Sequence, residues 1–290
     1  MFVIAGITGQ TGAAAAEALL ARGQRVRAPV RDLGRAAPWA ARGVELVQSD
    51  VADAERLAAV LDGAEGAYML APPDLAHPDP VGSYAATARA VAAASRKAGL
   101  ARLVFLSSEG AHLPSGTGPI RGLHEAEAIL AGAVPTLTFL RATFFQENWR
   151  PVFGLAAEQG ILPTMLDPLD RPRTMVATRD IGRVAAELLL ETAPPAIVEL
   201  SGPEPYSAND VAQAVGRALG RQVAAVQPPR EAWVATLQAA GLGEAYATLI
   251  AEMYDGINAG HVRFSGQAEA RSGTTGLSDT LAGWTAAKAA

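Results

Sequence analysis

The sequence lacks several features on which common classes of protein depend. It has no cysteine, which excludes disulfide bonds, thiolate metal sites and cysteine nucleophiles. No apolar run approaches the roughly 20 residues needed to cross a bilayer. The net charge is −5 without a strong basic patch, which argues against nucleic-acid binding. With 290 residues, half of them apolar, we expect a globular cytoplasmic protein that holds no metal.

The first twenty residues carry the most informative motif. Residues 2–5 are apolar and predict a buried parallel strand, and residues 13–20 are rich in strong helix formers. Between them, three glycines are spaced Gly-x-x-Gly-x-x-Gly. Gly6 allows a tight turn, Gly9 lets the backbone approach a pyrophosphate, and Gly12 lets the helix lie close to the strand. The helix N-terminus would attract the anion; the alternative is a turn that serves only a tight connection.

Strand-like and helix-like segments alternate through the first half of the chain. Strands are predicted at residues 24–31, 43–47, 66–71, 102–106 and 137–140. This alternation predicts an α/β fold with a doubly wound parallel sheet of the Rossmann type. Pro29 lies inside the first of these segments, which either weakens the strand prediction there or makes the strand an exposed one. We divide the chain into a dinucleotide-binding Rossmann domain, residues 1–150, and a smaller C-terminal α/β lobe, residues 151–290, with segments that return to the sheet.

Ligands of a doubly wound sheet bind beyond the carboxyl ends of its strands. We therefore expect cofactor contacts from the glycine turn and from these strand ends. The candidates are Gly6, Thr8, Gly9, Gln10, Thr11, Gly12, Arg31, Asp50, Ala71, Pro72 and Ser107.

Arg31 bears on which dinucleotide is bound. In the dinucleotide fingerprint, an acidic residue about 20 positions after the last glycine binds the ribose 2′-hydroxyl. That count reaches Arg31, whose guanidinium suits a 2′-phosphate, and Arg35 offers a second contact. NADP(H) is therefore favoured over NAD(H), although Asp32 could turn toward the ribose. The alternative for Arg31 is an ordinary solvated residue.

Asp50 follows the predicted strand at residues 43–47 and is placed to reach the edge of the adenine. The alternative is that Asp50 merely starts the following loop.

Several segments together resemble the NmrA-like family, an atypical short-chain dehydrogenase group. The family includes type 2 quinone oxidoreductases, triphenylmethane reductase and nitrogen-regulation redox sensors. The resemblance rests on residues 6–12, 30–32, 123–127, 140–149 and 176–182. It implies NADP(H) bound by the glycine turn and Arg31. It also implies a substrate pocket over the nicotinamide, formed with the C-terminal lobe by Phe144, Phe145, Asn148 and Trp149.

The proton-transfer pair of the short-chain dehydrogenases is missing. That pair is a tyrosine with a lysine four residues further on. The only lysines are Lys97 and Lys288, and neither follows a tyrosine at that spacing. In the corresponding helix, residues 122–131, His124 is the candidate catalytic residue, as a proton donor or a ribose contact. A solvated or capping role for His124 is the alternative.

Two functions follow from these observations. The first is an NAD(P)H-dependent reductase of a small quinone-like or conjugated aromatic acceptor, which takes a hydride directly and can be protonated by solvent. The second is an NADP-binding redox sensor with little or no turnover. For either function we expect that the protein binds neither nucleic acid nor a membrane. The sequence leaves open whether it forms a homodimer.

Overall fold

The computed structural model describes the backbone of residues 1–289 and the side chains of residues 1–285, so the side chain of Lys288 lies outside the described residues. Its centre is an eight-stranded sheet in which all neighbouring strands are parallel. The strand order is β13-β10-β6-β5-β4-β1-β2-β3. The strands are β1 Phe2–Ile4, β2 Val26–Val30, β3 Glu45–Gln48, β4 Gly66–Met69, β5 Arg102–Ser108, β6 Thr136–Ala142, β10 Ile197–Ser201 and β13 Glu269–Ser272. The predicted doubly wound parallel sheet is confirmed.

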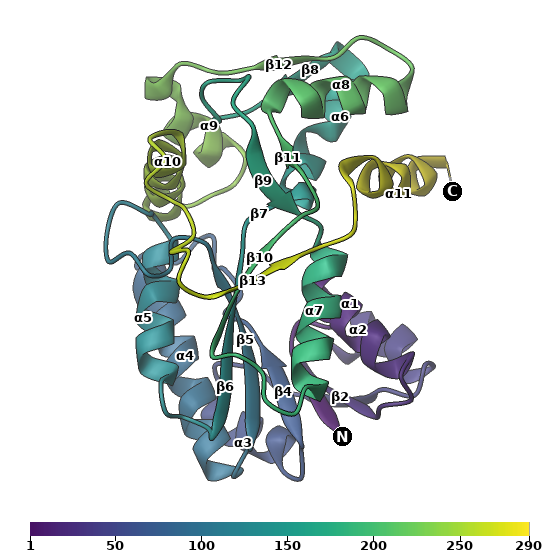
Figure 1. Cartoon of the computed structure of the whole chain (residues 1–290), viewed down its shortest axis with the longest axis vertical. Coiled ribbons are helices and arrows are strands. Elements are labelled where there is room, and N and C mark those ends of the chain that lie inside the picture. Colours follow the sequence, from purple (N-terminus) through teal and green to yellow (C-terminus); the bar gives the residue numbers. More distant parts are fainter. Residues whose placement is uncertain (290) are drawn as a thin grey trace.

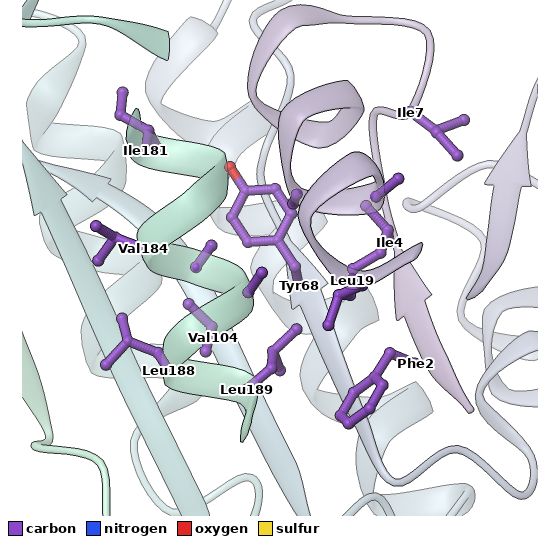
Figure 2. Close-up of a cluster of buried hydrophobic side chains, with 14 of the residues drawn as sticks. Phe2, Ile4, Ile7, Leu19, Tyr68, Val104, Ile181, Val184, Leu188 and Leu189 are labelled. Carbon is purple, nitrogen blue, oxygen red and sulfur yellow. The ribbon is translucent and has the colours of Figure 1, made fainter. Parts of the chain in front are cut away.

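Helices cover both faces of this sheet (Figure 1). One face carries α1 (Gln10–Leu20), α2 (Leu33–Ala40) and α7 (Thr178–Leu190), and the other carries α3 (Ala54–Leu61), α4 (Pro80–Lys97) and α5 (Ile120–Leu130). Successive side chains of a strand point to opposite faces, so Phe2 and Ile4 join one core while Val3 joins the other. Figure 2 shows the first core, where side chains of α7 meet those of β1 and α1.

The helix that follows the glycine turn is fixed by a close approach of α7. A Cβ on Gly182 of α7 would lie 2.5 Å from the Cβ of Ala14 and from the backbone of Thr11 in α1. The two helices therefore cross at a distance that only small residues allow. Beneath them, the buried Tyr68 hydroxyl donates a hydrogen bond of 3.0 Å to Thr11 Oγ1.

A smaller lobe stands over the carboxyl ends of the strands (Figure 1). Its core gathers Trp149, Phe153, Leu162, Val211 and Trp284. The elements beyond the main sheet are β7 Phe144–Phe145, η1 Gln146–Trp149, α6 Arg150–Gln159, β8 Ile161–Pro163, β9 Arg173–Val176, β11 Pro205–Tyr206, α8 Ala208–Leu219, β12 Ala224–Val226, η2 Arg230–Ala232, α9 Trp233–Ala239, α10 Glu244–Asn258 and α11 Leu277–Ala289.

The second half of the chain also supplies parts of the main sheet. β10 pairs with β6, β13 pairs with β10, and α7 covers α1. The chain thus passes between lobe and sheet several times. None of the helices within residues 1–289 is both long and apolar enough to span a membrane.

Candidate functional site

A cavity of about 700 Å³ opens at the carboxyl ends of β1, β4, β5 and β6. From the lobe side, Met253, Ile257 and Val262 of α10 and the following loop close it. The predicted site residues that line it are Gly6, Thr8, Gly9, Gln10, Thr11, Arg31, Ala71, Pro72, Ser107, Phe144, Phe145 and Asn148. The parallel sheet brings them together because all of its carboxyl strand ends meet at one edge.

The glycine turn forms one wall of the cavity. Gly6 has a φ of 66°, a left-handed conformation that favours glycine. Helix α1 begins directly after Gly9, with no side-chain cap and no acidic residue in its first turn. Its first N–H groups are therefore available to a ligand, as a diphosphate would require. Gly9 has an ordinary φ of −99°, so its backbone does not require glycine. It lines the cavity, and a Cβ there would lie 3.2 Å from the Gly6 carbonyl oxygen, so the missing side chain keeps this part of the turn compact.

Gly12 plays a different part from the other two glycines. It does not line the cavity, contrary to its place among the expected cofactor contacts. A Cβ there would lie 2.4 Å from the carbonyl oxygens of Ala5 and Gly6. Its role is the close packing of α1 on β1.

The end of β2 presents two arginines to the cavity. Arg31 and Arg35 both line it, and among residues 1–285 neither side chain forms an ion pair. Asp32, the residue that could have favoured a free ribose, instead caps α2 by accepting from the Arg35 backbone N–H at 3.1 Å. Asp50 is exposed, accepts from the Ala52 N–H at 2.9 Å and lies outside the lining, contrary to expectation. The donors at this end suit a phosphate group.

Ser107 connects the cavity to a buried ion pair. Its hydroxyl donates to Glu127 Oε1 at 2.6 Å. Arg141 donates to the same carboxylate through Nε at 2.9 Å and Nη2 at 2.6 Å. All three side chains are buried, so this polar network fixes the end of β5 against α5 and β6.

The end of the cavity that follows β6 is largely apolar. Phe144, Phe145 and Asn148 line it, and the buried Thr143 hydroxyl on the same wall has no hydrogen-bond partner within the described structure. A bound ligand could satisfy this hydroxyl. Trp149 does not line the cavity, because its indole points into the core of the lobe and donates to Met175 Sδ at 3.4 Å. Successive residues of the short helix η1 point in different directions, which separates Asn148 from Trp149.

His124, the candidate catalytic residue, also lies outside the lining. Its Nδ1 is 2.9 Å from the carbonyl oxygen of Ala111, and its neighbour Leu123 borders the cavity instead. This contact joins the interior of α5 to the segment after β5, and His124 caps neither end of the helix.

Glu109 is a residue of the cavity wall that is absent from the predicted site residues. It follows β5 directly and lines the cavity. Burial raises its pKa to about 8, against the attraction of Arg173 and a hydrogen bond from the Phe144 backbone N–H. Its position directly after a predicted strand end could have identified it as a site residue. Its apolar surroundings could not be foreseen, because they come from residues distant in sequence.

Most of the chain is similar to known oxidoreductases. The model of the NmrA-like family matches residues 1–265. The chain is 26% identical over 268 residues to quinone oxidoreductase 2 of Escherichia coli K12, covering 90% of this chain and 89% of that protein. It is 27% identical over 256 residues to the NAD(P)H azoreductase of Xenophilus azovorans, covering 88% and 86%. The crystal structure of the E. coli quinone oxidoreductase QOR2 with NADPH shares the fold, with a TM-score of 0.81 and 24% identity over 98% of this chain and 99% of that one.

Proposed function

Because the chain belongs to the NmrA-like family, we propose that it is an NADP(H)-dependent reductase that transfers a hydride to a small quinone-like or conjugated aromatic acceptor. One observation carries the proposal. A single cavity runs from phosphate-binding groups at the glycine turn and the end of β2 to a largely apolar end beside Phe144 and Phe145. Two relatives named as a quinone oxidoreductase and an azoreductase support a flat, electron-poor acceptor.

The assignment of NADP(H) rests on two groups of residues, one for the diphosphate and one for the 2′-phosphate. The uncapped start of α1 receives the diphosphate, and Gly9 keeps the backbone accessible to it. Arg31 and Arg35 hold the 2′-phosphate, since Asp32 is engaged in capping α2. When bound, NADPH supplies the hydride, that is, two electrons and one hydrogen nucleus.

The remaining residues position the acceptor. Phe144 and Phe145 offer ring surfaces for stacking, and Asn148 offers a polar side chain that can hydrogen-bond an acceptor oxygen or nitrogen. Met253 and Ile257 of the lobe border this end with apolar side chains, which reduces the contact of a bound acceptor with bulk water.

The test is oxidation of NADPH under anaerobic conditions in the presence of a panel of quinones and azo compounds. Loss of the reduced-nicotinamide absorbance that requires both protein and acceptor would support the reductase. Gly9→Val, which should not bind the cofactor, is the matched negative control. Tight NADPH binding without turnover of any acceptor would overturn the reductase and favour the redox sensor.

A further inference from the structure

Glu109 lies where two hollow spaces meet. Its side chain lines both the main cavity and a smaller chamber of about 230 Å³. Phe144, Ile257 and Val262 also border both spaces. The carboxyl group therefore stands at the proposed acceptor end, and β4 and β1 separate the strand that carries it from β2, whose end carries Arg31.

The surroundings of Glu109 favour its neutral form. No cation within residues 1–285 lies within ion-pair distance of it. The charged groups that face it are Arg173 of β9 and Arg263 after α10, which line the same small chamber. Arg173 and the Phe144 N–H lower the pKa, but burial outweighs both and raises it to about 8. At neutral pH most molecules then carry a protonated carboxyl group at this position.

The other candidate proton donors near the cavity are less suitable. Tyr84 lines the cavity, but burial and the neighbouring Tyr246 hydroxyl at 3.2 Å raise its pKa, so it holds its proton more tightly. The Ser107 proton is already donated to Glu127. His124 contacts the Ala111 carbonyl and does not border the cavity. Among the described side chains of the lining, Glu109 is the acid whose pKa lies near the working pH that general acid catalysis favours.

We propose that Glu109, as a protonated carboxylic acid, donates the proton that completes reduction of the acceptor, an inference that rests on the proposed reductase function. When an electrophilic carbon of the acceptor has taken up a hydride, negative charge collects on the conjugated oxygen or nitrogen. The O–H bond of Glu109 then breaks and a bond from that hydrogen to the acceptor heteroatom forms. The carboxylate left behind is stabilised by the Phe144 N–H and Arg173, and it regains a proton from water before the next turnover. One acceptor, one hydride and one proton thus give the two-electron-reduced product, so the proton comes from the protein and not directly from solvent.

The experiment compares Glu109→Gln with the parent and with Glu125→Gln, a control on the exposed side of α5. Steady-state quinone reduction is measured from about pH 6 to pH 10, and NADPH binding is measured separately by titration of its fluorescence. We expect the parent kcat to fall as pH rises through about 8. Glu109→Gln should lose on the order of 10²-fold in kcat at neutral pH and lose this pH dependence, with NADPH affinity unchanged. Glu125→Gln should behave as the parent.

A second measurement does not depend on turnover. Carbon-13 NMR of labelled glutamate carboxyl groups, with the Glu109 signal identified by its absence in Glu109→Gln, should show that this group ionises near pH 8. A carboxyl group that is ionised at pH 6 would overturn the inference, as would parent-like kcat and pH profile in Glu109→Gln. If the parent reduces no acceptor, the proposed function fails and the donor role fails with it, while the NMR titration still reports the charge state of the group. If Glu109→Gln does not fold, Glu109→Asp serves instead, and it should retain a pH-dependent decline with a displaced midpoint.

Discussion

Arg141 of β6 and Glu127 of α5 form a bidentate ion pair one side chain behind the cavity wall. The Nε–Oε1 distance is 2.9 Å and the Nη2–Oε2 distance is 2.6 Å, and both side chains are about nine-tenths buried. Ser107 adds a third hydrogen bond to the same carboxylate. This arrangement ties the strand end that carries Ser107 and Glu109 to the neighbouring strand and helix.

Removing one partner of this pair should be costly. Arg141→Met leaves Glu127 as a buried and unpaired carboxylate, so we expect the free energy of unfolding to fall by about 3–5 kcal/mol. Urea titration followed by circular dichroism measures the change. Lys97→Met, which breaks the exposed pair with Glu55, is the control and should leave the midpoint near that of the parent. An equally small loss of unfolding free energy in Arg141→Met would show that the ion pair does not stabilise the folded protein.

Cofactor preference should depend on Arg31. We expect NADPH to bind more tightly than NADH, and Arg31→Ala to remove most of the difference, about 1.5–3 kcal/mol for a charge-assisted contact. Calorimetric titration with both cofactors tests this. Arg25→Ala, an exposed arginine outside the cavity lining, should leave both affinities unchanged. Equal affinities in the parent protein would contradict the assignment of the 2′-phosphate site.

Substitutions at two glycines of the same turn should have different effects, one on cofactor binding and the other on stability. Gly9→Val adds a side chain to the cavity wall where a diphosphate would approach, and its Cβ would lie 3.2 Å from the Gly6 carbonyl oxygen, a contact that a small shift relieves. We therefore expect a folded protein without cofactor binding. Gly12→Ala forces a Cβ to within 2.4 Å of two backbone oxygens, so we expect a large loss of stability. Thermal unfolding and NADPH titration of both variants separate the effects. Retained cofactor binding in Gly9→Val would mean that the turn serves only the strand–helix connection.

His124→Ala should change turnover little. The ring contacts the Ala111 carbonyl and is not part of the cavity lining, so quinone reduction should stay within about tenfold of the parent, well below the loss expected for a general acid. Initial rates at saturating NADPH measure this. A thousandfold loss with normal NADPH binding would restore His124 as the proton donor.

Glu109 should also make stability depend on pH. Its pKa is raised from 4.5 to about 8 by burial, so between these values the folded state binds more protons than the unfolded state. Stability therefore decreases as pH rises through this window, and the decrease ends above the folded-state pKa. We expect Glu109→Gln to gain in melting temperature relative to the parent from pH 5 to pH 8. A constant difference across this range would contradict the raised pKa.

The local parts of the fold could be predicted from the sequence. The glycine turn and the strand alternation act through neighbours in the chain, and the turn and the first six strands stand where they were expected. Pro29 misled the prediction, because β2 is buried between β1 and β3 and not exposed. The register with β1 ends at Arg27, so the proline lies beyond that ladder.

Features that depend on distant contacts could not be predicted. The strand β13, Glu269–Ser272, has a polar sequence and exists because it pairs with β10 at the edge of the sheet. The family resemblance implied that Trp149 lines the substrate pocket, but its indole packs in the core of the lobe. Burial raises the pKa of Glu109, and the residues that line the same cavity include Ile257 and Val262, about 150 residues away along the chain.

The return of α7, β10 and β13 to the main sheet bears on how the chain must fold as it is synthesised. When only the first 150 residues have left the ribosome, the face that α7 will cover is bare and the edge of β6 has no partner. Exposed apolar faces and unpaired edges promote aggregation of nascent chains. The last strand of the sheet becomes available only when residue 272 has emerged. Completion of the nucleotide-binding half is therefore postponed almost to the end of translation, and a fragment ending near residue 150 should be insoluble.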